Sequence, residues 1–249
     1  SLLDDGITYR ALVRDGSLNG KRIALSLTLG IAEPLPAVRT VVERAAQVFA
    51  GLGAIVEPAD PFSESPLKIF ETLALGAFWG LLRAQTPQTV ALMDPGLVAL
   101  CRRGKTVTQE QYVAAIAQRA SLGQRLRQFF DRFDLLLSPT MPIPAAYADP
   151  REDGLPDPNN FTSWMPYTSP FNLAKNPSCS IPCGFVDELP IGLMVTGPLW
   201  GDLAVLQACH AYEEAAGPPW PSPELLGCLD KIARAADAAT IGKRWKRLS

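Results

Sequence analysis

The runs Lys-Arg-Ile-Ala-Leu-Ser-Leu at residues 21–27 and Ala-Ile-Val-Glu at residues 54–57 are short, apolar and close together. Their composition predicts two β-strands. Residues 37–50, between them, place apolar side chains on one helical face, namely Val38, Val41, Val42, Ala45, Ala46 and Phe49. Gly51 and Gly53 favour the end of that helix, because glycine readily takes a left-handed conformation. A strand, a helix and a strand at this spacing predict a right-handed parallel crossover, and therefore an α/β fold.

The middle of the chain is predicted to be helical. Ser65-Pro66 is a start signal, with proline at the first helical position of a segment that reaches about Arg83. Thr108 and Gln111 have the spacing of a capping box, which predicts the start of a long helix to about Phe130.

The pattern changes after this helix. Residues 134–137, Asp-Leu-Leu-Leu, predict a short buried strand. The strand runs into Ser-Pro-Thr-Met-Pro-Ile-Pro at residues 138–144, where the prolines exclude a helix. Residues 145–163 are rich in Asp, Pro, Gly and Asn and predict a long surface loop, of a length that is usually functional or disordered.

Two further strands are predicted over residues 178–186 and 191–197, followed by a helix over residues 202–216 that we expect its aspartate to cap. The predicted architecture is therefore a mixed sheet covered by helices within residues 1–217. Residues 218–249 form a Pro-rich and then basic tail, which we interpret as a solvated end.

Composition excludes several classes of protein. The 249 residues are 47% hydrophobic and 19% charged, which is enough apolar material for a packed core. The net charge of −2 gives no positive field for nucleic acid, and no apolar run is long enough to span a membrane. Five cysteines are too few for a disulfide scaffold in a chain of this length, and an odd number cannot all pair. The first residues do not have the pattern of a signal peptide. We therefore expect a cytoplasmic protein with neither nucleic acid nor a membrane as its partner.

Catalytic chemistry has few candidates. The only histidine, His210, lies on the polar side of its predicted helix, so we expect a solvated residue rather than a general base. Cys179 and Cys183 have no second close pair to complete a zinc site, and small buried thiols are the better interpretation. Ser65 and Lys68 match the serine–lysine pattern, but the companion motifs are absent. No glycine-rich phosphate-binding motif occurs, so the residues alone indicate no complete catalytic set, no metal site and no cofactor.

Three segments in order resemble the amidase signature family. Residues 134–142 are similar to its strand and Pro-Thr-x-Pro loop, and residues 168–184 to its Asn-Leu-x-Gly-x-Pro segment. Residues 189–198, followed by Asp202 and a helix, complete the resemblance, which covers about residues 15–216. The resemblance implies the amidase signature fold and hydrolysis of an amide bond.

In that family a serine nucleophile is bridged by a second serine to a lysine, and these residues precede the region matched here. This chain has no two adjacent serines. The resemblance therefore implies that residues 1–217 are the C-terminal portion of an amidase domain, a fragment with no catalytic residue of its own. Its expected partners are a small-molecule amide substrate, the N-terminal half of the same domain and further copies of itself. We expect the chain alone to be inactive.

Four residues are candidates for substrate binding: Trp164, Tyr167, Phe171 and Asn172. Aromatic groups beside the matched asparagine suit an apolar acyl or aryl substrate, although core packing of the rings is an open alternative. We expect Asn172 and Tyr167 to share one loop facing a concave surface, with His210 exposed and distant.

Two departures from the family pattern bear on the substrate. Lys175 replaces a family glycine, which predicts either a backbone that avoids a positive φ or a loose match. Met165-Pro-Tyr-Thr168 stands where glutamine-dependent relatives tend to have Asp-x-Phe-Thr. A stand-alone amidase for a neutral or aromatic linear amide is therefore preferred. The alternatives are a glutaminase-type A subunit of a tRNA-dependent amidotransferase and a non-catalytic scaffolding piece.

Overall fold

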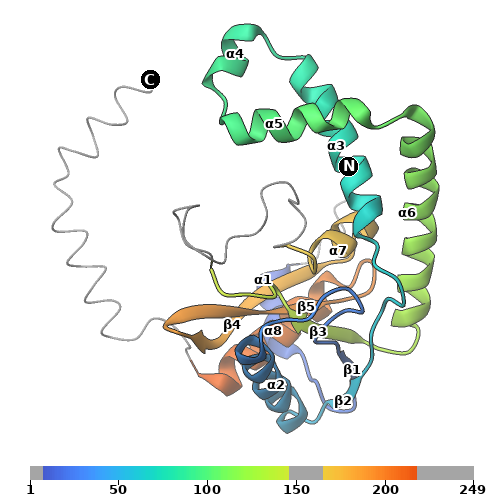
Figure 1. Ribbon diagram of the computed structural model, residues 1–249. Helices are drawn as coiled ribbons and strands as arrows, with labels where there is room; N and C mark the ends of the chain where they lie inside the picture. Colours follow the sequence, from blue (N-terminus) through green and yellow to red (C-terminus); the bar gives the residue numbers. More distant parts are fainter. Residues whose placement is uncertain (1–7, 146–164, 218–249) are drawn as a thin grey trace, which may run out of the picture.

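The computed structural model describes residues 8–145 and 165–217 (Figure 1). Trp164, nearly all of the predicted loop and the tail over residues 218–249 lie outside the described residues. The described residues form one five-stranded sheet in the order β2-β1-β3-β5-β4. The strands are β1 (Arg22–Leu25), β2 (Ile55–Pro58), β3 (Leu135–Pro139), β4 (Ser178–Val186) and β5 (Leu189–Thr196).

The sheet is mixed, as the sequence predicted. Strand β1 runs parallel to β2 on one side and to β3 on the other. Strand β5 is antiparallel to both β3 and β4. Strands β1, β2 and β3 therefore end at the same edge of the sheet, which we call the carboxyl edge.

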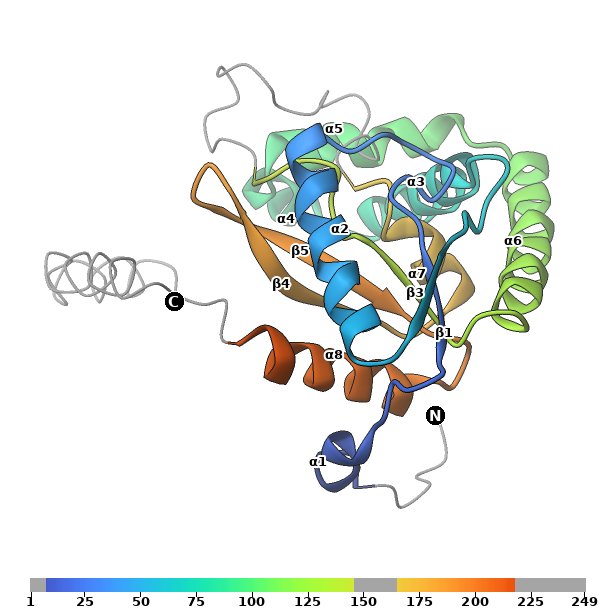
Figure 2. The same ribbon diagram turned by 90° about the horizontal axis from the view of Figure 1, so that it is seen from below.

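Helices cover both faces of the sheet (Figures 1 and 2). Helices α2 and α8 pack on one face, and α3, α6 and α7 lie over the other. The described helices are α1 (Tyr9–Leu12), α2 (Pro36–Gly51), α3 (Leu67–Arg83), α4 (Pro87–Leu92), α5 (Pro95–Arg103), α6 (Gln109–Phe130), α7 (Ser169–Ala174) and α8 (Asp202–Ala216), with short 3-10 turns at Val13–Asp15 and Gly104–Thr106.

Alternation along the strands explains these three layers. Ile23 packs into the core under α2 and α8, whereas its neighbour Ala24 packs on the opposite side. Strand β3 repeats the pattern, with Leu135 and Leu137 on the first side and Leu136 on the second. Successive side chains of a strand point to opposite faces, so a sheet buried on both sides reads as a continuous apolar run.

The predicted helices follow their sequence signals closely. All six apolar residues predicted for one face of α2 are buried. The capping box of α6 is confirmed, because the hydroxyl of Thr108 accepts from the Gln111 amide at 3.2 Å. In return, the Gln111 side-chain oxygen accepts from the Thr108 amide at 3.0 Å.

Three local expectations were wrong. Asp202 does not cap α8: it is the first helical residue, and Gly201 stands at the N-cap without a side-chain bond. Helix α3 begins at Leu67, so Pro66 is the N-cap rather than the first helical residue. Lys175 adopts φ 64°, so the backbone there does take the left-handed conformation that the family glycine suits.

Candidate active-site wall at the carboxyl edge

The carboxyl edge is the first place to look for a site. Strand β2, the next strand along the chain, lies on one side of β1, and β3 lies on its other side. The strand order therefore changes direction at β1. Ligands of open α/β sheets bind outside the carboxyl ends of strands at such a switch point. Three segments leave the sheet here: residues 26–35 after β1, residues 59–66 after β2 and residues 140–145 after β3. A hydrogen bond from the Leu35 amide to the Pro142 carbonyl at 2.9 Å joins the first to the third.

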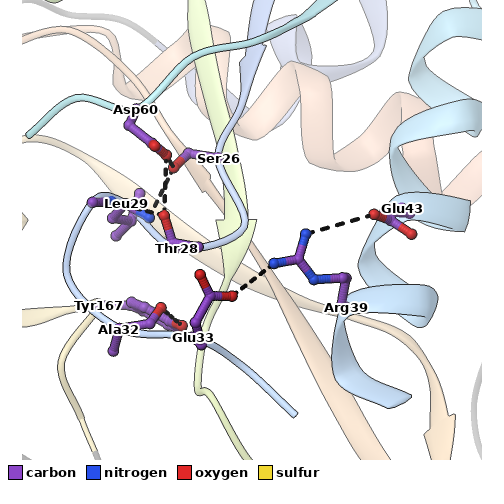
Figure 3. Close-up of polar contacts among 10 residues, drawn as sticks. Ser26, Thr28, Leu29, Ala32, Glu33, Arg39, Glu43, Asp60 and Tyr167 are labelled. Carbon is purple, nitrogen blue, oxygen red and sulfur yellow. Dashed lines mark hydrogen bonds and ion pairs between the residues drawn. The ribbon is translucent and has the colours of Figure 1, made fainter. Parts of the chain in front are cut away.

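Buried hydroxyl and carboxylate groups hold the first of these segments (Figure 3). The buried hydroxyl of Ser26 donates to the Asp60 carboxylate, which follows β2, and accepts from the Leu29 amide at 2.8 Å. Thr28 donates to the same carboxylate oxygen at 3.3 Å. These bonds tie the ends of β1 and β2 together and fix the turn that follows β1.

That turn contains consecutive left-handed residues, Leu29 at φ 54° and Gly30 at φ 71°. A side chain at residue 30 would place its Cβ 1.9 Å from the Phe62 carbonyl oxygen, so only glycine fits. Leu29 is fully buried against the α6 side of the core, which compensates for its strained backbone.

Tyr167 links this turn to α7. Its hydroxyl donates to the Ala32 carbonyl at 2.7 Å, and its ring is fully buried (Figure 3). Burial, assisted by the negative charge of Glu33 and opposed by Arg39, raises the pKa of Tyr167 well above its usual range. The hydroxyl is therefore a fixed neutral donor and not a group that transfers protons near neutral pH.

Two ion pairs that share one arginine border the same segment. Arg39 at the start of α2 contacts Glu33 at 2.7 Å and Glu43 at 4.0 Å. These side chains are partly exposed, so each pair contributes at most about 1 kcal/mol to stability. Glu33 lies beside Tyr167 at the end of the turn (Figure 3).

Helix α7 is held from three sides across the sheet face. Tyr167 anchors its start, and Arg119 of α6 donates to the Leu173 carbonyl at 2.7 Å. Beyond its end, the Asn176 amide donates to the Gly197 carbonyl at 2.8 Å. The left-handed Lys175 reverses the chain between the helix and this last anchor.

The predicted site residues thus fall into different positions. Tyr167 and Phe171 are buried, and Phe171 packs on Phe62 with ring centroids 6.1 Å apart. Asn172 is exposed on α7, and Trp164 lies outside the described residues. Of the three described residues, only Asn172 has an exposed side chain. A role in substrate binding stays a prediction for all of them.

The cavities do not single out these residues. Three cavities of about 510, 420 and 290 Å³ are lined by other parts of the described chain. The largest of the three lies between α3 and α6 and contains Lys68, Glu71 and Arg103. None of the three is lined by Tyr167 or Asn172.

The rejected candidates are distant from this wall. His210 lies on α8, which packs on the opposite face of the sheet from α7. Its side chain is 26% exposed and lies 3.9 Å from Glu214, so it is half-buried rather than exposed as we expected. Ser65 contacts the Leu67 amide at 3.4 Å at the start of α3, as a residue beside a helix end does. Within residues 8–145 and 165–217, no three His, Cys, Asp or Glu side chains are grouped to hold a metal.

Sequence reasoning missed Ser26 and Asp60. Their signal was position, because each follows the carboxyl end of a predicted parallel strand, where functional side chains of α/β sheets gather. The hydrogen bond between Ser26 and Asp60 depends on how β1 and β2 align in the sheet. The composition of the two strands does not determine that alignment.

With the fold and this geometry in place, comparison with known proteins identifies the class. The model of the Amidase family matches residues 9–206, most of the chain. The chain belongs to the amidase family, and the predicted resemblance is confirmed.

The curated relatives include glutamyl-tRNA(Gln) amidotransferase subunits A. The protein from Synechococcus sp. (strain JA-3-3Ab) is 37% identical over 119 residues, which are 46% of this chain and 23% of the relative. The protein from Methanosarcina barkeri is 38% identical over 108 residues, which are 41% of this chain and 21% of the relative. The matched region is therefore less than a quarter of each relative.

Solved structures match over a longer stretch of this chain. A bacterial aryl acylamidase of the amidase signature family has a TM-score of 0.71 and 27% identity over 88% of this chain and 48% of its own. A 6-aminohexanoate cyclic dimer hydrolase also has a TM-score of 0.71, at 20% identity over 90% of this chain and 50% of its own. The chain spans about half the length of both, and the α/β mixed sheet matches these structures.

No helix of the described residues combines the length and apolar character needed to cross a membrane.

Proposed function

We propose that this chain builds one part of an enzyme that hydrolyses a linear, neutral amide of small size, with an acyl anilide as the model substrate. Family membership supports amide hydrolysis in general. The similarity to a bacterial aryl acylamidase, at 27% identity, supports the aryl class.

The sequence of the segment before α7 is the observation that favours a neutral amide over glutamine as the substrate. Residues 165–168 read Met-Pro-Tyr-Thr, where glutamine-dependent enzymes of the family tend to have an acid followed by x-Phe-Thr. Met165 offers no carboxylate for the ammonium group of glutamine, and Tyr167 is a neutral donor tied to Ala32. The uncharged side chain of Met165 and the neutral hydroxyl of Tyr167 suit a neutral substrate.

The chain's role is to support and line the site. The turn held by Ser26 and Asp60 fixes the tyrosine that anchors α7, and α7 presents Asn172 at its exposed face. A serine nucleophile needs a base beside it, and the developing oxyanion needs donors. We assign these groups to the segment of the family that carries the adjacent serines and the lysine. Its partner is therefore the N-terminal half of an amidase domain.

A second candidate is a glutaminase-type A subunit of a tRNA-dependent amidotransferase. The identity of 37–38% with such subunits from Synechococcus and Methanosarcina favours it. In that case the acid missing at Met165 would have to be supplied by another residue.

The test is a substrate comparison in a reconstituted enzyme. The chain is co-expressed with an amidase segment that carries the serine–serine–lysine residues, and release of aniline from acyl anilides and of ammonia from glutamine is measured. We expect anilide turnover and little glutaminase activity. Glutamine as the preferred substrate would support the amidotransferase subunit instead, and inactivity of a stable complex on both would support a scaffolding piece. Asn172→Ala, which alters the exposed face, should lower anilide turnover, whereas the exposed Gln124→Ala on α6 should not.

A further inference from the structure

Two cysteines meet between strand β4 and helix α8, on the sheet face opposite α7. Cys179 pairs in register with Val195 of β5, whose buried side chain lies in the core that α8 covers. Cys209 belongs to the inward face of α8 in the same core. The two thiols lie close enough that each is the largest influence on the other's pKa. The two sulfur atoms are therefore neighbours across the interface of β4 and α8.

The pair is asymmetric in exposure. Cys209 is buried, whereas Cys179 is half-buried in β4, which is an edge strand of the described sheet. An edge strand is bonded on one side only. The partial exposure of Cys179 leaves its sulfur the more accessible of the two.

The asymmetry extends to charge. The interaction with Cys209 holds the pKa of Cys179 below its usual range, at about 7, against opposing effects of burial and of the Glu213 carboxylate. The same interaction, together with burial, raises the pKa of Cys209 well above its usual range. A thiolate therefore forms on the sulfur that a reagent can reach.

We propose that Cys179 and Cys209 form a peroxide-sensitive pair, in which Cys179 reacts first and Cys209 then closes a disulfide between β4 and α8.

The reaction is balanced with hydrogen peroxide as the oxidant. The Cys179 thiolate attacks one peroxide oxygen, an S–O bond forms, the O–O bond breaks, and hydroxide leaves to be protonated to water. Cys179 is then a sulfenic acid. The Cys209 sulfur attacks the Cys179 sulfur, the S–S bond forms and the S–O bond breaks. The thiol proton of Cys209 joins the departing hydroxide, so two thiols and one peroxide give one disulfide and two waters.

Two other cysteines of the described residues, Cys183 and Cys101, differ from Cys179 in their surroundings. Cys183 lies on the same strand, donates to the Ile191 carbonyl at 3.4 Å, and has a pKa raised to about 12 by burial. Cys101 is buried in the separate cluster of α3 and α5. Both are therefore predicted to remain thiols under conditions that oxidise Cys179.

The first test uses the unmodified full chain. The chain is treated with hydrogen peroxide, remaining thiols are blocked with N-ethylmaleimide, and the peptides are mapped by mass spectrometry. We expect a peptide linked through Cys179 and Cys209 that disappears after reduction, with Cys101 and Cys183 blocked. In the untreated chain, iodoacetamide should modify Cys179 first, at a rate that rises with pH through about 7.

Two variants separate the steps. In Cys209→Ser the reaction should stop at the sulfenic acid of Cys179, which dimedone traps. In Cys179→Ser, Cys209 should remain a thiol. Cys183→Ser is the matched control on the same strand and should form the same disulfide as the unmodified chain.

The proposal is overturned if Cys179 is modified no faster than Cys183 in the untreated chain, or if peroxide leaves both members of the pair as thiols. A disulfide that joins Cys179 to any other cysteine of a folded chain also overturns it. Because these measurements use the unmodified chain, they decide the question even where a serine variant fails to fold.

Discussion

At the scale of single residues, Lys175 adopts the left-handed conformation that suits the glycine of the family pattern. Its φ of 64° closes α7, a conformation that glycine adopts without strain. The lysine is exposed, and no hydrogen bond is identified for its side chain in the described residues. The left-handed backbone conformation is therefore present at this position without a glycine.

Lys175→Gly should stabilise the chain by about 1 kcal/mol, because relief of left-handed strain exceeds the added entropy of the unfolded chain. Urea unfolding monitored by circular dichroism measures this change. Lys175→Ala, which keeps the strain, is the control and should show no gain. A glycine variant less stable than the natural chain would contradict the assignment of strain to this residue.

Tyr167 and Asn172 should separate stability from function. Tyr167→Phe removes the donor to the Ala32 carbonyl and should lower the free energy of unfolding by about 1 kcal/mol. Asn172→Ala alters an exposed side chain and should change it by less than about 0.5 kcal/mol. Chemical denaturation of both variants checks this. Equal losses of stability would show that Asn172 supports the fold rather than a ligand.

At the scale of secondary structure, local signals predicted some elements fully. The capping box and apolar spacing of residues 108–130 correspond to α6, and residues 178–186 are β4 as predicted. Helix α7 carried no such signal, because six residues are too few to show a helical period. Its position depends on bonds from distant residues such as Arg119 and Tyr167.

The sequence predicted which residues lie near the candidate site, but not which of them are buried or how they pair. The sequence and the family resemblance placed Tyr167, Phe171 and Asn172 close together, and α7 contains or adjoins all three. Which of them is buried depends on how α7 packs on the sheet, and this is decided by tertiary contacts. The pairing of Ser26 with Asp60 likewise requires two strands to be aligned.

Thr108→Ala tests the capping box of α6. The substitution leaves the Gln111 amide without its acceptor and should cost about 1 kcal/mol of stability. Ser121→Ala is the control within the same helix, because Ser121 is exposed and alanine favours helix. Thermal or urea unfolding of the two variants should therefore differ. Equal stability would show that α6 is held by packing alone.

At the scale of the whole molecule, apolar side chains remain exposed. Leu92 is 89% exposed on α4 and Trp200 is 75% exposed before α8. Val113 and Ile116 lie three residues apart on α6 and are each more than half exposed. Large exposed apolar patches mark sites where proteins associate or aggregate. We therefore propose that α6 is covered by another copy of the chain.

Val113→Lys combined with Ile116→Lys should reduce self-association of the purified chain, measured by light scattering at several concentrations. Gln124→Lys on the same helix adds charge without removing apolar area and serves as the control. A natural chain that remains monomeric at every concentration would contradict the proposed association.

We propose that this chain supplies the sheet and a supporting wall of an amidase, whereas another segment supplies the nucleophile. The direct measurement is labelling with a serine-directed fluorophosphonate, followed by intact-mass spectrometry of the chain alone and of the chain co-purified with a serine–serine–lysine segment. We expect no adduct on this chain in either sample, and an adduct on the other segment together with anilide turnover in the complex. A stoichiometric adduct on a serine of this chain would contradict it.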